Sequence, residues 1–591
     1  MLVANHIATE VPSQDLFVCR QMVKQRPKSG PMRLNLARAL FAADYPAEAV
    51  EQCAMGLELA PSLRDAAWFL ASLLQRYELN ESIKVSARSL RTAMQYIDVD
   101  RQALCTAAIA SLKHELPLKD IVAAGPIEGW VTAAHRILGG KGRRILQNRL
   151  FRTALTVGVN TDIEVEFLLT ALRRALLDKP ERLQDRPIYE FACVLIQQCA
   201  NNGYVFHATD EENDKLAALQ VDPEALFEGR KSATSDFTLA SLYAPIATLI
   251  DPTLAARGYD QITPRALRPV IALAMDTLRE EAEITALLPE LTPVTNNISQ
   301  RVAKQYCTAP YPQWFSLQAP ERNTARRVLG NYFSNAETNR LKAPCDILIA
   351  GAGTCQQAVH SAITYGAHAQ IVAIDVSAPS LAYGARMAKR LGVENIHFAT
   401  ADILRLREID QMFDVIECVG VLHHMADPYA AWRILVEKLQ PGGLMQIGLY
   451  SEIARRTIAA LSNDPDWPGT NASDGALRTF RHRLMQRAHE EPGSNLTASI
   501  DFFATSDFRD LALHVKEQHC ALPEIRDFFA GCDLEFRGFI LPPAVYQMYS
   551  EMFPGDKMPG SLDNWWEFEQ TCPNTFNGMY MFWCRRREVG E

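Results

Sequence analysis

The chain has 591 residues, more than one hydrophobic core usually supports, and at about 150 residues per domain it predicts several folding units. Hydrophobic residues make up 48% of the sequence and charged residues 22%, the balance of an ordinary globular protein. The formal net charge of -9 argues against a nucleic-acid partner, because phosphates are bound by basic surfaces.

Signals for secretion, membrane insertion and metal binding are missing from the sequence. The amino-terminal segment lacks the basic start and apolar run of a signal peptide, and no stretch of about 18 uncharged apolar residues predicts a membrane span. The thirteen cysteines form no CxxC pair, so we expect no metal site. Scattered cysteines in an acidic chain favour reduced thiols and a cytoplasmic location.

Residues 1–125 predict helix after helix, because alanine and leucine recur at helical spacing. The segment that ends at Pro61 resembles one tetratricopeptide repeat. Its small residues Ala37, Ala49 and Gly56 stand where two helices of such a repeat pack closely. A tetratricopeptide-like array is therefore the preferred interpretation, and a generic helical bundle is the alternative. Residues 126–300 predict a second helical domain, in which no motif indicates chemistry.

From about residue 340 short apolar runs alternate with helices, which is typical of a parallel sheet with crossover helices. Seven strands are predicted, and the isolated last one is expected to insert antiparallel. They span residues 346–351, 370–376, 396–402, 413–419, 443–450, 534–541 and 578–586. The expected fold class is a multidomain chain, with an all-α amino-terminal half followed by a doubly wound α/β domain.

Four predicted strand ends carry candidate ligand-binding residues, because ligands of such sheets bind at the carboxyl ends of the strands. The first strand leads into Gly351, Ala352 and Gly353, where glycine lets the backbone turn tightly and approach a ligand. Asp375, followed by Val376, ends the second strand, and its carboxylate can accept hydrogen bonds from both hydroxyls of a ribose. Dinucleotide-binding proteins use both devices, so these two features do not show which kind of ribose-containing ligand is bound.

The third and fourth strand ends are more informative. Asp402 can accept from an exocyclic amine while Ile403 packs on an adenine ring. Cys418 and Val419 end the fourth strand, where the reacting group of a ligand is expected. A Pro-Gly-Gly turn at residues 441–443 then precedes the fifth strand, and such a turn is not expected in a dinucleotide-binding domain.

In order and spacing, these features resemble the class I S-adenosylmethionine-dependent methyltransferases, most closely the type 11 group with its LHH and LxPGG runs. The resemblance implies a Rossmann-like, seven-stranded methyltransferase domain over residues 301–591 with S-adenosylmethionine as its cofactor. It implies binding by Gly351, Ala352, Gly353, Asp375, Val376, Asp402, Ile403, Cys418 and Val419. The chain departs from the family at Cys355, where a third glycine is usual.

Five other segments are similar to bacterial proteins that join tetratricopeptide repeats to a methyltransferase of unsettled substrate. These segments are residues 197–206, 305–317, 450–456, 506–518 and 565–583. The similarity implies the domain organisation more than the substrate.

An insertion at about residues 451–520 is long enough to roof an active site. Within it, Arg509, Asp510 and His514 share one face of a predicted helix with Ser506 and Glu517. If this face lines the acceptor pocket, Asp510 orients His514, or Arg509 holds an anionic substrate. The alternative is an exposed charged stripe.

Two adjacent histidines, His423 and His424, follow the fourth strand. Neighbouring side chains on a helix point about 100° apart, so both cannot face one ligand well. We interpret them as structural residues or as part of the cofactor wall, and a role as general base is the alternative.

Three functions remain open. The preferred one is methylation of a protein or peptide that the helical amino-terminal half recruits, since repeat arrays present concave faces to extended peptides. The second is methylation of a small metabolite, with the helical half serving stability or homo-oligomer formation. The third is a scaffold that binds the cofactor without turnover.

Overall fold

The structure is a computed structural model that describes residues 16–80, 83–114, 118–230, 232–341, 343–490 and 495–588. The chain folds into two compact units. The helical unit contains the residues up to Arg279 together with Trp314–Gln318 and Ala472–Phe508. The sheet unit contains Glu280–Gln313, Ala319–Asn471 and the residues from Arg509 onward. None of the helices in the described ranges is both long and apolar enough to cross a membrane.

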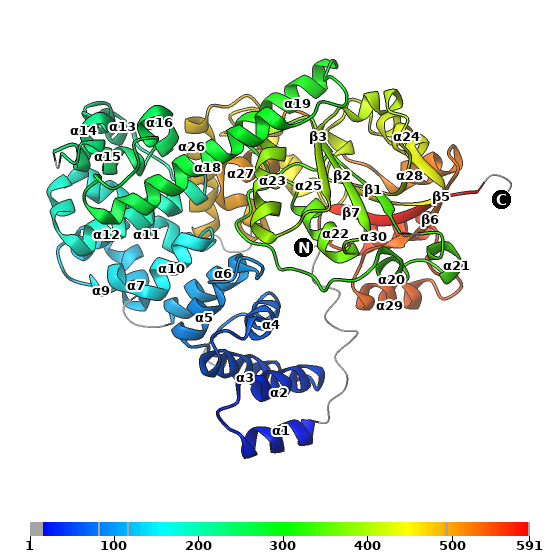
Figure 1. The fold of residues 1–591 in the computed structure, drawn as a ribbon, viewed down its shortest axis with the longest axis horizontal. Coiled ribbons are helices and arrows are strands. Elements are labelled where there is room, and N and C mark those ends of the chain that lie inside the picture. The colour runs from blue at the N-terminus through cyan, green and yellow to red at the C-terminus, as the bar shows by residue number, and fades with distance from the viewer. Residues whose placement is uncertain are drawn as a thin grey trace. The chain divides into compact units, whose positions relative to one another are not determined.

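The helical unit is built from helices alone (Figure 1). Its elements are α1 (Leu16–Gln25), α2 (Gly30–Ala42), α3 (Pro46–Leu59), α4 (Arg64–Leu74), α5 (Ala87–Ala93), α6 (Arg101–Lys113), α7 (Leu118–Glu128), α8 (Trp130–Leu138), α9 (Arg144–Gln147), α10 (Arg149–Val157), α11 (Ile163–Asp178), η1 (Pro180–Gln184), α12 (Arg186–Asn201), α13 (Asp210–Ala217), α14 (Pro223–Phe227), α15 (Ser232–Ser241), α16 (Ile246–Leu249), α17 (Pro252–Ala255), η2 (Arg265–Leu267), α26 (Asp474–Glu490), η6 (Asn495–Ala498) and η7 (Ile500–Phe503).

Helices α2 and α3 pack closely because glycine stands at their crossing. A Cβ atom added to Gly56 would lie 3.0 Å from the carbonyl oxygen of Gly30. Ala37 and Ala49 are fully buried, as the repeat-like pattern predicts. This pair has the close packing expected of one repeat, and the tetratricopeptide assignment of the whole segment stays a prediction.

Residues 472–508 fold with the helical unit, whereas the sequence prediction places all of 451–520 in the carboxyl-terminal domain. The reason is a buried ion pair within that unit. Both terminal nitrogens of Arg481 on α26 contact the carboxylate of Glu166 on α11, at 2.6 and 2.7 Å. Both side chains are at most 2% exposed, and such a pair is costly to separate.

The sheet unit contains one seven-stranded sheet with the order β3-β2-β1-β4-β5-β7-β6. Only β7 runs antiparallel to its neighbours, as predicted. The strands are β1 (Cys345–Ala350), β2 (Ala369–Asp375), β3 (Ile396–Thr400), β4 (Phe413–Val419), β5 (Leu439–Tyr450), β6 (Leu534–Phe539) and β7 (Met579–Arg586). The predicted fold class is confirmed, with a helical amino-terminal half followed by this sheet.

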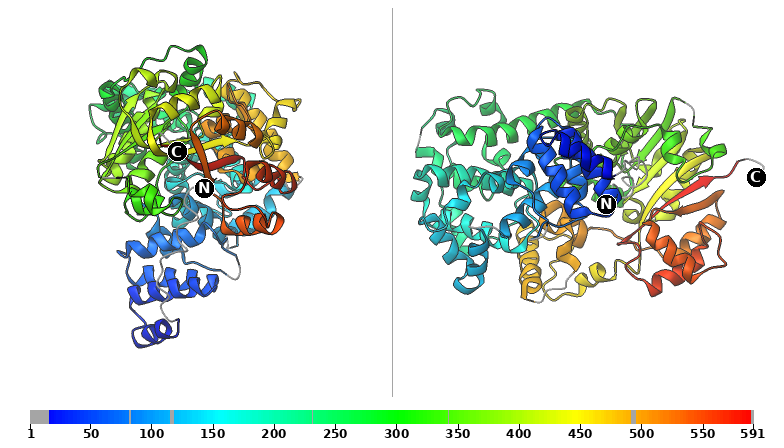
Figure 2. Two further views of the ribbon diagram at one scale, coloured as in Figure 1. Left: turned by 90° about the vertical axis from the view of Figure 1, so that its right-hand side faces the viewer. Right: turned by 90° about the horizontal axis from the view of Figure 1, so that it is seen from below.

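Further helices belong to the sheet unit and cover its sheet (Figure 2). They are α19 (Asn297–Thr308), α20 (Ala325–Leu329), α21 (Asn335–Thr338), α22 (Gln356–Tyr365), α23 (Ala378–Leu391), η3 (Ile403–Glu408), η4 (Leu422–His424), α24 (Pro428–Lys438), α25 (Arg456–Ala459), η5 (Ala460–Asn463), α28 (Leu522–Ala530), α29 (Pro543–Met552) and α30 (Leu562–Thr571). Two helices pass from one unit into the other, α18 (Arg268–Leu287) and α27 (Thr505–Leu513).

Alternate residues of the central strands face opposite layers of the sheet unit. Cys418 of β4 lies in an apolar core with Trp432 of α24 and Phe528 of α28. Its neighbour Glu417 points the other way and accepts a hydrogen bond from Ser361 of α22. Helices therefore cover both faces, which explains why the central strands read as nearly continuous apolar runs.

Candidate functional site

The glycine-rich turn after β1 needs left-handed backbone. Gly351 and Gly353 have φ angles of 72° and 51°, which glycine adopts without strain. A Cβ atom on Gly351 would lie 2.4 Å from a methyl carbon of Val421, which follows β4. The turn therefore leaves room at the carboxyl ends of β1 and β4 only because side chains are missing there, as predicted. Ala352 stays within the turn, and its N–H donates to the carbonyl of Ile374 at 2.8 Å.

The departure from the family at Cys355 has a structural compensation. Cys355 adopts a φ of 61°, a conformation that normally favours glycine, and its side chain is fully buried. A Cβ atom added to Gly384 on α23 would lie only 2.4 Å from the Cβ of Cys355. The space that the thiol occupies is thus provided by a glycine on the facing helix, and the turn is retained.

Asp375 at the end of β2 is the anchor of the turn. Its two carboxylate oxygens accept from the backbone N–H groups of Gly353 and Ser377, both at 2.8 Å. Burial raises the pKa of this carboxyl group, and the backbone hydrogen bonds oppose that shift. With lone pairs left over, the carboxylate is placed to accept from ribose hydroxyls. Val376 follows it and is half-buried.

Asp402 after β3 carries an unsatisfied acceptor. One of its carboxylate oxygens accepts from the N–H of Leu404 at 3.0 Å, while the other is buried without a hydrogen-bond partner among the described residues. Such an atom is costly unless a ligand supplies the donor, and the exocyclic amine of adenine is one. The side chain of Ile403 is buried beside it. The residues present therefore fit the predicted cofactor.

A short segment outside the predicted motifs positions Asp402. Thr292 lies beside the end of β3, and its hydroxyl oxygen accepts from the N–H of Asp402 at 2.9 Å. Leu291 donates its N–H to the carbonyl of Thr400 at 2.9 Å, in the manner of an additional edge strand. Sequence reasoning missed this contact, because nothing in the local pattern of residues 289–292 indicates pairing with β3.

At the end of β4, the structure separates the two predicted residues. The thiol of Cys418 is fully buried in the apolar core, where burial raises its pKa, so its side chain does not face a ligand site. Val419 is half-buried and points toward β5, because a Cβ atom on Gly448 would lie 2.8 Å from its methyl carbon. Only the backbone of Cys418 is available for the role that the sequence predicts.

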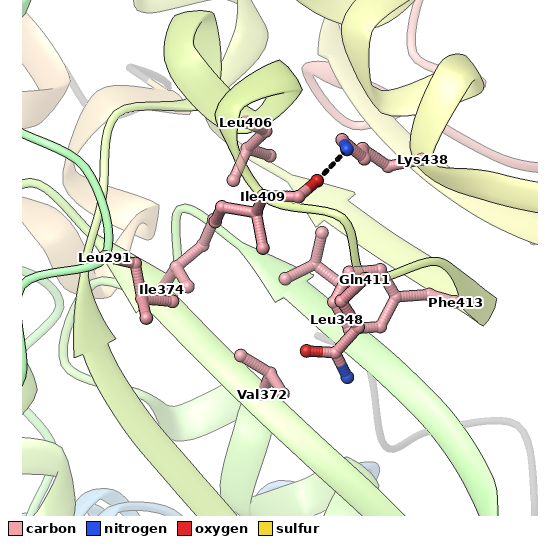
Figure 3. A pocket seen from close by; sticks show the side chains of 9 residues that line it. All are labelled: Leu291, Leu348, Val372, Ile374, Leu406, Ile409, Gln411, Phe413 and Lys438. Carbon is pink, nitrogen blue, oxygen red and sulfur yellow. Dashed lines mark hydrogen bonds between the residues drawn. The ribbon is translucent and has the colours of Figure 1, made fainter.

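An apolar cavity lies beside η3 (Figure 3). In Figure 3 Ile374, Leu406 and Phe413 are among the side chains that surround it, and the ammonium of Lys438 bonds to the carbonyl of Ile409 at its edge. Of the predicted cofactor residues, none lines this cavity. The cavity is part of the core, and we assign it no ligand.

The prediction that five residues of the insertion share one helix face is only partly correct. Helix α27 ends at Leu513, so His514 and Glu517 lie beyond it. Asp510 and His514 are nevertheless brought together and buried, with 2% and 7% of each residue exposed. They do not form an exposed stripe. Arg509 is half-buried, and its role stays a prediction.

Tyr306 of α19 joins this pair. Its hydroxyl donates to a carboxylate oxygen of Asp510 at 2.6 Å and lies 3.2 Å from Nε2 of His514. Tyr306 also lies near the cofactor residues, because its carbonyl accepts from the hydroxyl of Ser380, 3.5 Å away at the start of α23. Trp314, which lies in the same similar segment 305–317, belongs instead to the helical unit.

His424 completes what we call the acceptor cluster, formed by Tyr306, His424, Asp510 and His514. The rings of His424 and His514 are stacked with their centroids 3.7 Å apart. Nδ1 of each ring lies close to the carbonyl oxygen of Lys516, at 2.8 and 2.5 Å. For His424 this contact suits a proton on Nδ1, which leaves Nε2 with its lone pair. Nδ1 of His514 also accepts from the backbone N–H of Lys516 at 3.0 Å, and in that tautomer Nε2 carries the proton and donates to the hydroxyl oxygen of Tyr306.

The ring of His423 faces Tyr450 and is not part of the acceptor cluster, which agrees with the expectation that two adjacent histidines cannot both face one ligand. Its ring is stacked on Tyr450 with centroids 3.7 Å apart, and it is fully buried. Burial lowers its pKa well below the usual range, so the ring is neutral. Arg455 lies over the same tyrosine and forms an ion pair with Glu517 at 2.8 Å. These residues build the wall behind the acceptor cluster.

Comparison with known proteins finds a family match that covers β1 to β5 and extends into α26. Residues 341–486 match the model of a family described as methyltransferase domain. A curated protein of Synechococcus sp., described as uncharacterized, is 41% identical over 210 residues, which are 33% of this chain and 48% of that protein. The chain thus spans about half the length of this curated relative.

Two solved structures are also similar, at low TM-scores. PKMT2 from Rickettsia typhi is 12% identical, with a TM-score of 0.33, over 44% of this chain and 51% of that one. The N-methyltransferase NodS from Bradyrhizobium japonicum WM9, solved with S-adenosyl-L-homocysteine, is 19% identical, with a TM-score of 0.20, over 27% and 77%. The chain contains a methyltransferase domain, and the family match agrees with S-adenosylmethionine as its cofactor.

Proposed function

We propose that this protein transfers a methyl group from S-adenosylmethionine to a protein or peptide that its helical unit recruits. The observation that best supports this cofactor is the buried, unpartnered oxygen of Asp402. Asp402 follows β3, the strand adjacent to the one that ends at Asp375. Two carboxylates at the ends of adjacent parallel strands suit an adenosine, one for the amine of adenine and one for the ribose. The methyltransferase-domain match over residues 341–486 supports the same cofactor.

The residues of the chain contribute by positioning the cofactor and the acceptor. S-adenosylmethionine, when bound, supplies a methyl group on a sulfonium, and its transfer is an in-line displacement that needs no covalent help from the protein. Asp375 and Asp402 hold the adenosine, and the glycine turn keeps the backbone close to the ligand. The acceptor cluster presents the unprotonated Nε2 of His424, the ring of His514 and the hydroxyl of Tyr306, which are suited to holding an acceptor and receiving its proton.

The protein or peptide acceptor is supported by the helical unit. Helices α2 and α3 have the close packing expected of one repeat, and arrays of such repeats offer a concave face to extended chains. On α2, Asn35 and Arg38 are half-buried. Arg33 does not belong with them, because its guanidinium already bonds to Gln52 at 2.7 Å and to the carbonyl of Pro27 at 3.0 Å.

One observation favours the second candidate, a small-molecule acceptor. The acceptor cluster is buried, with Asp510 at 2% and His514 at 7% exposure, and a small molecule or a single extended side chain fits such a site better than a folded surface.

The deciding experiment uses the purified full chain with isotopically labelled S-adenosylmethionine and a cell lysate separated into proteins and small molecules. Label in the protein fraction, with a mass increase of whole methyl groups, supports the proposal. Label confined to the small-molecule fraction supports the second candidate. Cofactor binding by calorimetry without label in either fraction indicates a scaffold, and binding of NAD in place of S-adenosylmethionine contradicts all three.

A further inference from the structure

Three side chains of the acceptor cluster converge in the way that metal ligands do. One ring nitrogen of His424, one of His514 and one carboxylate oxygen of Asp510 all lie within 4.8 Å of one another. All three residues are buried, and they come from η4, from α27 and from the segment that follows α27. We propose that His424, Asp510 and His514 form a binding site for one divalent transition-metal ion.

The donor set defines the class of ion. Two imidazole nitrogens with one carboxylate oxygen suit Zn²⁺ and its neighbours in the first transition row, whereas Ca²⁺ and Mg²⁺ prefer oxygen ligands alone. Three protein ligands leave at least one coordination position open for a water or a substrate. Zn²⁺ is the probe of choice because it is redox-inactive.

The contacts around the three donors are those of an outer ligand shell. Metal-binding histidines usually donate their second ring N–H to a carbonyl or carboxylate, which fixes the ring and its tautomer. Here the carbonyl of Lys516 lies 2.8 Å from Nδ1 of His424. Nδ1 of His514 lies 2.5 Å from the same carbonyl and 3.0 Å from the N–H of Lys516, so metal binding through Nε2 selects the tautomer in which Nδ1 donates to the carbonyl. Tyr306 does the same for the carboxylate by donating to Asp510 at 2.6 Å.

The cluster needs a small rearrangement to bind an ion. Two donors that each lie about 2.1 Å from one ion in tetrahedral geometry are about 3.4 Å apart, so the observed spread, which is at most 4.8 Å, must contract by up to about 1.4 Å. The histidine rings are stacked with an interplanar angle of 29° and must turn away from each other so that both lone pairs point at the ion. His514 also contacts Tyr306 at 3.2 Å, and this contact is replaced by the metal bond.

A metal here changes how the acceptor is held, and this part of the inference rests on the proposed function. An oxygen or nitrogen of the acceptor that occupies the open position loses its proton more easily, because the positive charge of the ion lowers its pKa. The cluster then acts through the ion, and His514 serves as a ligand in place of a free base.

Metal binding itself is tested on the full chain after treatment with a chelator and removal of the chelator. Titration with Zn²⁺ in a calorimeter is expected to show one site per chain, with a dissociation constant below about 1 µM. Loading with Co²⁺ is expected to give the visible absorption bands of a low-coordinate site with nitrogen ligands. Absence of a stoichiometric site for both ions overturns the proposal.

Variants locate the site. His424→Gln and Asp510→Asn are each expected to weaken Zn²⁺ binding at least about 100-fold, more than the loss of an outer-shell partner. The matched control is His519→Gln, because His519 lies nearby, bonds to Glu517 at 2.6 Å and is not one of the three donors. Unchanged binding in His424→Gln, or an equal loss in His519→Gln, contradicts the assignment. Thermal unfolding verifies that each variant is folded, and the Co²⁺ spectrum of the unaltered chain is a test that needs no variant.

The two proposals fail separately. Zinc binding without S-adenosylmethionine binding leaves the metal site standing and removes the proposed function. Methyl transfer by the chelator-treated chain at an undiminished rate leaves the proposed function standing and removes the role of the ion in it.

Discussion

The cofactor residues and the acceptor cluster of the sheet unit are assembled in different ways. Gly353, Asp375 and Asp402 lie at or just after the carboxyl ends of neighbouring parallel strands, so their proximity is a consequence of strand order. The acceptor cluster draws on α19, η4, α27 and the segment after α27, and Tyr306 and Asp510 are 204 positions apart in the sequence. A site at the ends of regular elements can therefore be located from local motifs, whereas a site made by packing distant segments cannot.

The largest effect is expected for the acceptor cluster. His514→Ala removes the ring that contacts both Tyr306 and His424, and we expect turnover to fall by about 100-fold or more. The affinity for S-adenosylmethionine is expected to stay nearly unchanged, because the adenosine is held elsewhere. Steady-state kinetics and calorimetry on the same preparation measure both quantities. A parallel loss of cofactor affinity breaks the comparison, since the two regions would then be one site.

Asp375→Ala is expected to change the affinity for S-adenosylmethionine, the quantity that His514→Ala leaves nearly unchanged. It removes charge-assisted hydrogen bonds to the ribose, each worth about 1.5–3 kcal/mol, so the affinity for S-adenosylmethionine should fall at least tenfold. Asp375→Asn is the matched control, since it keeps the shape and one acceptor oxygen. Calorimetry on folded protein measures the change, and a dissociation constant unaltered by Asp375→Ala shows that the ribose binds elsewhere.

The compensation between Cys355 and Gly384 is expected to have a smaller effect, on stability. Gly384→Ala places a Cβ atom 2.4 Å from that of Cys355, and we expect the free energy of unfolding to fall by about 1–3 kcal/mol. Adding Cys355→Gly removes the clash and should restore most of that loss. Denaturant unfolding of the two single variants and the double variant measures the coupling. Additive effects show that the thiol and the helix do not compete for the same space.

The smallest effect concerns pH. Burial raises the pKa of Asp375, so its carboxylate is protonated at a higher pH than an exposed aspartate. S-adenosylmethionine affinity should be constant near neutral pH and should fall as the pH drops through this raised value, because the protonated group accepts fewer hydrogen bonds. Calorimetry over a pH series measures the fall. Asp375→Asn should flatten the profile over the same range, and an unflattened profile assigns the titration to another group.

Several elements follow from the sequence because their causes are local. The alternation of apolar runs and helices predicts all seven strands, and the glycines at 351 and 353 predict the turn whose left-handed φ angles the structure has. Cys418 shows the limit of the same reasoning. Its position at the end of β4 is correct, but which of two adjacent side chains faces the core depends on the pleat of the strand and on Trp432 opposite.

The sequence by itself determined the α/β class of the sheet unit, its seven strands with an antiparallel last strand, and the carboxylates at the ends of β2 and β3. Strand period, glycine conformation and the geometry of parallel sheets depend on neighbours in the chain. Tertiary structure alone decided that residues 472–508 fold with the helical unit, that Thr292 positions Asp402, and that His424 meets Asp510 and His514. These contacts join segments that are far apart in the sequence, and they depend on which buried polar groups can form hydrogen bonds with each other. Neither property is encoded in any short stretch of residues.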